Sequence, residues 1–126
     1  MTVTVSSGTT YTISDGQTDA GDIVLSGGIE YVSSGGVDTG ATVSSGGKLI
    51  VYSGGVTDAT TLVGVSGTAG NTSTAYEILS GGTADNTTVS SGGALIISTG
   101  VASGTTVLSG GKLSVTLENL ETEPRF

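Results

Sequence analysis

The feature that most constrains this chain is a pair of adjacent glycines that recurs along the sequence. Such pairs begin at residues 27, 35, 46, 54, 81, 92 and 110, and the first four are separated by steps of 8, 11 and 8 residues. The repeating unit is therefore 19 residues long and contains two glycine corners. Single glycines at residues 8, 16, 67 and 100 continue the series, which gives five full units and part of a sixth. Repeats of about this length are typical of solenoids, in which successive units stack on one another.

Apolar residues keep register with these corners. The positions four residues before each class of corner are predicted to face the axis of the stack. They are Val24, Val43, Val63, Val89 and Val107 for one class, and Thr12, Val32, Val51, Ile78 and Ile96 for the other. β-Branched residues favour strands, and Ser-Gly-Gly triplets favour turns. We therefore predict an all-β fold, a parallel β-solenoid of five to six coils of about 19 residues.

The pattern also predicts where the domain ends and where it is interrupted. Residues 1–115 are assigned to the β-solenoid repeat domain. Residues 116–126 contain no glycine, three glutamates and the only Pro and Arg, which indicates a C-terminal cap, a boundary fragment or an added tail. Residues 68–74 interrupt the spacing and are predicted to form a surface loop, the alternative being a protrusion that contacts a ligand.

The composition excludes several classes of function. Gly, Ser and Thr make up half of the chain, Cys and His are absent, and the net charge is −8. Thiol nucleophiles, imidazole bases and disulfides are thereby excluded, and the negative charge argues against binding to a phosphate backbone. No apolar run is long enough to span a membrane. We expect a chain that is not an enzyme, has no cofactor, binds no nucleic acid and inserts no segment into a membrane.

The acidic residues were considered as metal ligands and as catalytic pairs. Asp15, Asp19 and Asp22 lie close in sequence, and carboxylates suit Ca²⁺, but their spacing matches neither an EF-hand nor a calcium-binding nonapeptide. We interpret them as solvated corner charges and predict no metal site. The other acids are expected on different coils, so no catalytic pair across a cleft is predicted. They are Glu30, Asp38, Asp58, Glu77 and Asp85.

Three residues are candidate ligand contacts. Tyr11 and Tyr31 both follow a corner by three residues, and as neighbours they could form a platform for a sugar or a stacked pair that supports the sheet. Asn71 lies in the interrupting segment and begins an Asn-Thr-Ser sequence that fits the N-glycosylation pattern, as does the sequence beginning at Asn86. Such matches arise by chance in a chain this rich in Ser and Thr.

The Ser-Gly-Gly corners with their flanking apolar residues resemble the 19-residue repeat of AIDA-type autotransporter adhesins. The resemblance is carried by residues 43–56, is repeated at residues 88–95 and 107–113, and extends over most of residues 3–115. It implies a secreted β-helical passenger segment on a Gram-negative surface, with roles in adhesion, self-association and biofilm formation. Passengers of this family are O-heptosylated on Ser and Thr by dedicated heptosyltransferases. The matching acceptors here are Ser34, Ser45, Ser53, Ser91 and Ser109, each directly before a glycine pair.

The same serines have a second interpretation, because serine hydroxyls in turns commonly bond to nearby backbone. The partners implied by the resemblance are like chains, a host-surface receptor or glycan, and a heptosyltransferase, and the implied location is extracellular. The chain contains neither a signal peptide nor a translocator, so we expect a piece of a longer protein or a repeat module from another architecture. Two hypotheses follow: a surface-displayed adhesin scaffold, and a carbohydrate-binding β-solenoid module.

Overall fold

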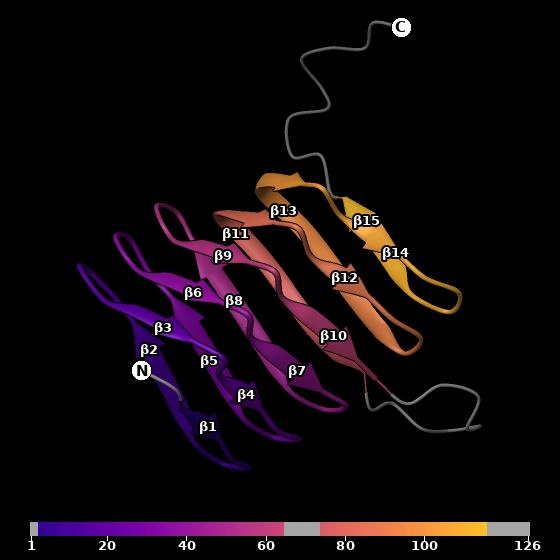
Figure 1. Ribbon diagram of the computed structural model, residues 1–126, viewed down its shortest axis with the longest axis horizontal. Coiled ribbons are helices and arrows are strands. Elements are labelled where there is room, and N and C mark those ends of the chain that lie inside the picture. Colours follow the sequence, from indigo (N-terminus) through magenta and orange to yellow (C-terminus); the bar gives the residue numbers. More distant parts are fainter. Residues whose placement is uncertain (1–2, 65–73, 116–126) are drawn as a thin grey trace, which may run out of the picture.

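The chain winds into a β-solenoid whose strands stack in parallel from coil to coil (Figure 1). The computed structural model describes residues 3–64 and 74–115, and all of its regular elements are β-strands. The coils comprise residues 3–21, 22–40, 41–59, 60–86 and 87–104, and a sixth begins at residue 105; we number them coil 1 to coil 6. This confirms the predicted fold.

Each coil follows three faces, and the first face is a sheet of six short strands. Their pairing is parallel throughout, with Val24 opposite Val43 and Leu62 opposite Val89. The strands are β1 (Thr4–Val5), β4 (Ile23–Val24), β7 (Thr42–Ser44), β10 (Thr61–Val63), β12 (Thr88–Val89) and β14 (Thr106–Val107).

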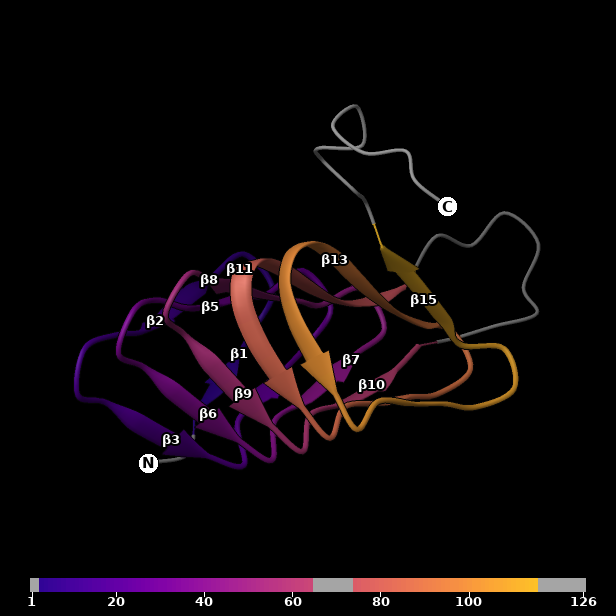
Figure 2. The same cartoon turned by 90° about the horizontal axis from the view of Figure 1, so that it is seen from above.

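The other two faces belong to one sheet, because two long strands turn the corner between them (Figure 2). These strands are β11 (Ala75–Asp85) and β13 (Gly93–Ser103), and the pairing of β11 shifts register between Ser80 and Thr83. The second face comprises β2 (Thr10–Ile13), β5 (Ile29–Val32), β8 (Lys48–Tyr52), the first parts of β11 and β13, and β15 (Lys112–Val115). The third face comprises β3 (Thr18–Ala20), β6 (Val37–Thr39), β9 (Val56–Asp58) and the last parts of β11 and β13.

The inward valine column of the first face is confirmed in part. Val24, Val43 and Val89 are fully buried as predicted, but Val63 is 43% exposed and Leu62 takes its place in the core. Counting back from a glycine in the interrupted unit placed the register one residue too late, and such a slip turns a side chain to the opposite face. Val107 keeps the predicted register opposite Val89 but is 42% exposed, because no coil among the described residues covers coil 6.

The second predicted column is shifted by one residue in three coils. The buried residues are Ile13, Val32, Val51, Leu79 and Ile97. Val32 and Val51 were predicted correctly, whereas Thr12, Ile78 and Ile96 point outward. The error has two causes. The Gly16 amide bonds to the Gly35 carbonyl, so Gly16 stacks on the first glycine of a pair and not on the second. In coils 4 and 5 the corner after the buried Leu79 and Ile97 is one residue shorter than the corner after Val51, which shifts the count at Ile78 and Ile96.

A third corner, which the glycine pairs do not mark, closes coils 1 to 5. Its residues all have positive φ, between 57° and 75°: Gly21, Gly40, Ala59, Asn86 and Gly104. Only two of the five are not glycine, and these are Ala and Asn. The 19-residue step from Gly21 to Gly40 to Ala59 is the signal that could have revealed this corner.

Two predicted segments lie outside the described residues. These are residues 116–126 and, except for Thr74, the predicted loop at residues 68–74. Coil 4 is longer than the coils before it, and the register places its additional residues between Val63, which pairs with Ser44, and Tyr76, which pairs with Lys48.

Candidate functional site

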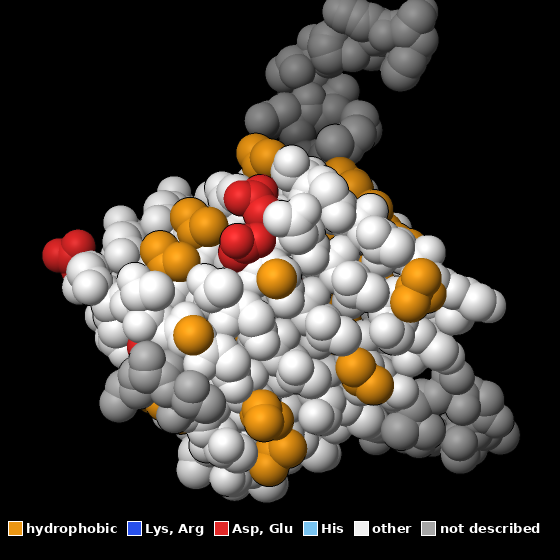
Figure 3. Space-filling view, in the orientation of Figure 1, with side chains coloured by type: hydrophobic (Ala, Val, Ile, Leu, Met, Phe, Trp, Pro, Cys, Tyr) orange, Lys and Arg blue, Asp and Glu red, His pale blue; other side chains and the backbone are white. Residues whose placement is uncertain are grey.

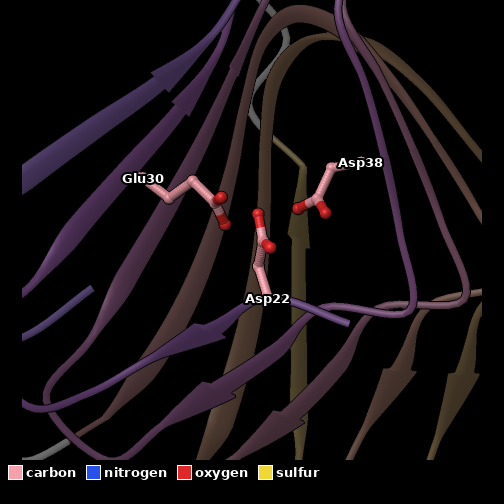
Figure 4. Close-up of side chains that lie close together, drawn as sticks. All are labelled: Asp22, Glu30 and Asp38. Carbon is pink, nitrogen blue, oxygen red and sulfur yellow. The ribbon is translucent and has the colours of Figure 1, made fainter. Parts of the chain in front are cut away.

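The interior of the solenoid contains a cluster of carboxylates contributed by a single coil. Coil 2 supplies Asp22 just before β4, Glu30 from β5 and Asp38 from β6, so that each of the three faces provides one acid. All three side chains have an exposed fraction of 0%. They point toward one another (Figure 4), and one oxygen of each lies within 4.8 Å of the others. We refer to these three residues as the acid cluster.

Very little in the structure compensates the acid cluster. The Val3 backbone amide donates a hydrogen bond of 2.7 Å to Asp22 Oδ1. The other five carboxylate oxygens of the cluster have no hydrogen-bond partner among the described residues. Buried polar groups are normally paired, so five unpaired oxygens in one place require an explanation.

The environment strongly disfavours negative charge at two of these acids. Burial is the main cause that raises the pKa of Glu30 well above its ordinary value, and interactions with Asp22 and Asp38 raise it further. Burial also raises the pKa of Asp38, with the charge of Asp22 as the next cause. The cluster therefore has to acquire positive charge, as protons or as a cation, to be stable inside the fold.

In coil 1, by contrast, a buried acid is paired with a tyrosine. The Tyr11 hydroxyl donates a 2.7 Å hydrogen bond to Asp19 Oδ2, and Gln17 Nε2 donates a 2.7 Å bond to the Tyr11 hydroxyl oxygen. The bond to Asp19, followed by burial, raises the pKa of Tyr11 to about 12. Tyr11 thus interacts with the solenoid interior.

A second compensated acid, Glu77, lies in coil 4. The Thr57 hydroxyl donates a 2.6 Å hydrogen bond to Glu77 Oε2, and the Thr87 hydroxyl donates a 3.1 Å bond to Oε1. Burial raises the pKa of Glu77 to about 7, although both hydroxyls oppose the rise. In the register of the second face, Leu49 lies between Glu30 and Glu77, so Glu77 is separated from the acid cluster.

The structure corrects the interpretation of the acids. Asp15 is exposed, as expected of a corner charge, but Asp19 and Asp22 are buried on either side of the third corner. Glu30 and Asp38 were expected on different coils, yet they belong to the same one. The unrecognised third corner explains the first error, because it turns Asp19 and Asp22 into the interior. The second error neglected the 19-residue unit itself, which already places Glu30 and Asp38, 8 residues apart, between the corners at Gly28 and Gly47. The alternation of β5 could have revealed Glu30, which lies two residues before the inward Val32.

The tyrosine candidates do not lie together as expected. The register pairs Tyr11 with Glu30 and Thr12 with Tyr31, so the two tyrosines belong to different columns. Tyr31 instead stacks on Tyr52 on the outer surface, with ring centroids 5.8 Å apart and an interplanar angle of 13°. Tyr52 was not among the predicted ligand contacts.

Of the two asparagines in N-glycosylation patterns, one can be placed. Asn86 lies at the third corner, where its side-chain amide donates a 3.1 Å hydrogen bond to Asp58 Oδ1. Asn71 lies outside the described residues, so its role as a ligand contact stays a prediction.

The predicted acceptor serines form rows along two corners of the solenoid. Ser45, Ser91 and Ser109 lie on the corner between the first and second faces, and Ser34 and Ser53 on the corner between the second and third. Ser34, Ser53 and Ser109 are exposed, and Ser45 and Ser91 are half-buried. Ser26 occupies the same row as Ser45 and was missed, although it also precedes a glycine pair.

Glycine at these corners is required by the serine of the preceding coil. A Cβ atom on Gly54 would lie 2.7 Å from the Ser34 hydroxyl oxygen, and one on Gly110 would lie 2.7 Å from that of Ser91. Both glycines also have a φ of 85°. The repeated Ser-Gly sequence thus allows each corner to stack on the one before it.

The surface around these corners is formed mainly by small polar residues. On the face shown in Figure 3, hydrophobic side chains are scattered among uncharged polar side chains, glycine and backbone atoms, and some acidic side chains gather in one place. A hollow of about 340 Å³ lies over the second face near its C-terminal coils. It is lined by Thr74, Tyr76, Gly92, Gly93, Ala94, Ile96, Gly110, Lys112 and Ser114.

Among the described residues there is no helix long and apolar enough to cross a membrane.

Comparisons with known proteins give one structural neighbour to report. No family model matches the chain, and no curated protein matches it. The chain is similar to the crystal structure of a TibC-catalysed, hyper-glycosylated TibA55-350 fragment. The similarity is distant. The two share 25% sequence identity at a TM-score of 0.49, and the match covers 91% of this chain and 60% of that fragment.

Proposed function

We propose that this chain is a non-enzymatic repeat scaffold of an autotransporter-type adhesin, displayed on a bacterial surface, where it mediates adhesion and self-association. The observation that carries the proposal is the arrangement of serine hydroxyls in rows along two corners of a regular parallel solenoid. Successive coils place equivalent residues about 4.8 Å apart, so neighbouring coils repeat the same corner chemistry, as Ser34 and Ser53 do at one corner and Ser91 and Ser109 at the other. This repetition suits a surface that engages many equivalent sites rather than one substrate.

The serine rows also support a role as acceptors of O-linked heptose. Ser34, Ser53 and Ser109 are exposed at corners, where the strands end and a transferase could reach the hydroxyl. The competing interpretation is that the hydroxyls only stabilise the turns. It applies best to Ser45 and Ser91, which are half-buried and interact with other groups.

Co-expression with a heptosyltransferase of the adhesin family, followed by intact-mass measurement, tests the modification. We expect a series of masses separated by one heptose, and fewer additions in a variant carrying Ser34→Ala, Ser53→Ala and Ser109→Ala. Thr10→Ala is the matched control, because Thr10 is exposed on a strand instead of a corner. A single unmodified mass, with the enzyme active on its own substrate, would leave only the turn-stabilising interpretation.

Self-association is tested by size-exclusion chromatography over a range of concentrations and by the settling of bacteria that display the chain. A strictly monomeric rod at high concentration, together with cells that stay in suspension, would contradict the adhesive role. A chain that stays monomeric in size-exclusion chromatography and still binds host cells would show adhesion without self-association.

The stacked tyrosines favour a second candidate function, the binding of carbohydrate. Tyr31 and Tyr52 present neighbouring rings on the outer surface, and Tyr52 is 42% exposed. Aromatic rings of this kind can pack against the apolar face of a sugar. A glycan array would detect saturable binding that Tyr31→Ala abolishes, with Tyr11→Phe as the control because the Tyr11 hydroxyl bonds to a buried acid. An array without saturable binding would rule this function out.

A further inference from the structure

The acid cluster differs from the other buried acids described above in the number of hydrogen bonds that its carboxylate oxygens accept. Glu77 accepts a hydrogen bond at each oxygen, and Asp19 accepts one from the Tyr11 hydroxyl. The acid cluster, which is just as buried, has five oxygens with no partner. The fold can supply hydroxyl donors to an interior carboxylate, yet coil 2 directs three carboxylates at one point and supplies none to Glu30 or Asp38.

The geometry of the acid cluster fits a metal ion at its centre. One oxygen from each acid lies within 4.8 Å of the other two. An ion equidistant from three such oxygens would be roughly 2.8 Å from each at most, and small movements would bring it to the 2.3–2.6 Å typical of calcium. We propose that Asp22, Glu30 and Asp38 bind one calcium ion, enclosed in the solenoid by coils 1 and 3.

The ligand chemistry selects calcium among the common cations. The cluster offers only oxygen, and the chain has no Cys or His to attract softer metals. Three bidentate carboxylates supply up to six oxygens, which is within the range that calcium accepts. Magnesium usually keeps several of its waters, and a cluster with an exposed fraction of 0% is poorly suited to a hydrated ion.

The position of the acid cluster predicts how the ion enters. In the register of the second face, Glu30 lies between Tyr11 of coil 1 and Leu49 of coil 3. On the third face, Asp38 lies between Asp19 and Thr57. An ion at the centre is therefore covered on both sides, and we expect it to be bound during folding and to exchange slowly afterwards.

The first experiment measures calcium retention. The purified chain is unfolded, refolded with either calcium or EDTA, desalted, and analysed for bound metal. We expect about one calcium per chain for the wild type and for Glu77→Gln, and less than a tenth of that for Glu30→Gln. Glu77→Gln is the matched control, because it removes a buried acid that hydroxyl donors already satisfy.

A second readout does not depend on the folding of any variant. Terbium replaces calcium in oxygen sites, and the ring of Tyr11, in register with Glu30, is placed to sensitise its emission. Wild-type chain refolded with terbium is expected to emit on tyrosine excitation, and calcium present during refolding should suppress the signal.

The thermal midpoint completes the test. Calcium is expected to raise the midpoint of the wild type by about 5 °C or more at pH 7.5, and to leave Glu30→Gln unchanged. Wild-type chain that retains no calcium, shows no terbium emission and has the same midpoint in calcium and EDTA would overturn the proposal. That result would assign the stability of the acid cluster to shared protons.

Discussion

Replacing Glu77 by Gln is expected to stabilise the protein at pH 8 and to have little effect at pH 4.5. The carboxyl group of Glu77 is fully buried and accepts hydrogen bonds from Thr57 and Thr87. Gln has nearly the same shape and does not titrate. Its amide can replace the carboxyl because a threonine hydroxyl can either donate or accept a hydrogen bond.

The size of the effect follows from the pKa of Glu77. Burial raises this pKa from 4.5 to about 7. Between these values the native state binds more protons than the unfolded state, so the free energy of unfolding falls as the pH rises. The contribution is fully present below pH 4.5 and is lost above pH 7, and the loss amounts to roughly 3 kcal/mol. The advantage of Glu77→Gln over the wild type should therefore grow from near zero to about 3 kcal/mol across this range.

Urea unfolding followed by circular dichroism at pH 4.5, 6 and 8, in EDTA throughout, measures this difference. Asp15→Asn is the control for the loss of one negative charge, because Asp15 is exposed. The reasoning would be refuted if the free energy of unfolding of the wild type and that of Glu77→Gln changed equally with pH, so that their difference stayed the same at all three pH values.

Three further predictions concern packing and backbone geometry. Leu62→Ala should destabilise the protein by about 2–5 kcal/mol in urea unfolding, and Val63→Ala by less than about 1 kcal/mol, because only Leu62 is in the core; equal costs would contradict the observed register. Gly36→Ala should lower the thermal midpoint more than Gly16→Ala. A Cβ on Gly36 would lie 2.5 Å from the Ile13 carbonyl oxygen, whereas a Cβ on Gly16 would meet no atom within 4 Å and Gly16→Ala carries only the strain of a φ of 77°. The reverse order would show that this strain costs more than the close approach at Gly36. Ala59→Gly should raise the unfolding free energy by about 0.5–1 kcal/mol, because Ala59 has a φ of 60°, and a loss of stability would show that this conformation is not strained.

The sequence by itself was sufficient to predict the architecture. The glycine pairs, the Ser-Gly corners and the 19-residue step are local features, and each specifies a turn or a strand without reference to distant residues. Once successive units have the same local structure, parallel stacking is the arrangement that buries their apolar residues. The positions of Val24, Val43 and Val89 in the core therefore follow from the repeat alone.

The tertiary structure decided which side chains the coils enclose. Side chains alternate between the two faces of a strand, so the choice between Leu62 and Val63 depends on a register that only pairing with β7 and β12 defines. The acid cluster depends on the third corner, where the chain adopts positive φ at Ala59 and Asn86 as well as at glycines. That corner directs all three faces of the coil toward one axis. Asp22, Glu30 and Asp38, which are 8 residues apart in sequence, thereby come into proximity. The sequence specifies the identity of these acids, but their proximity arises only from the closure of the coil.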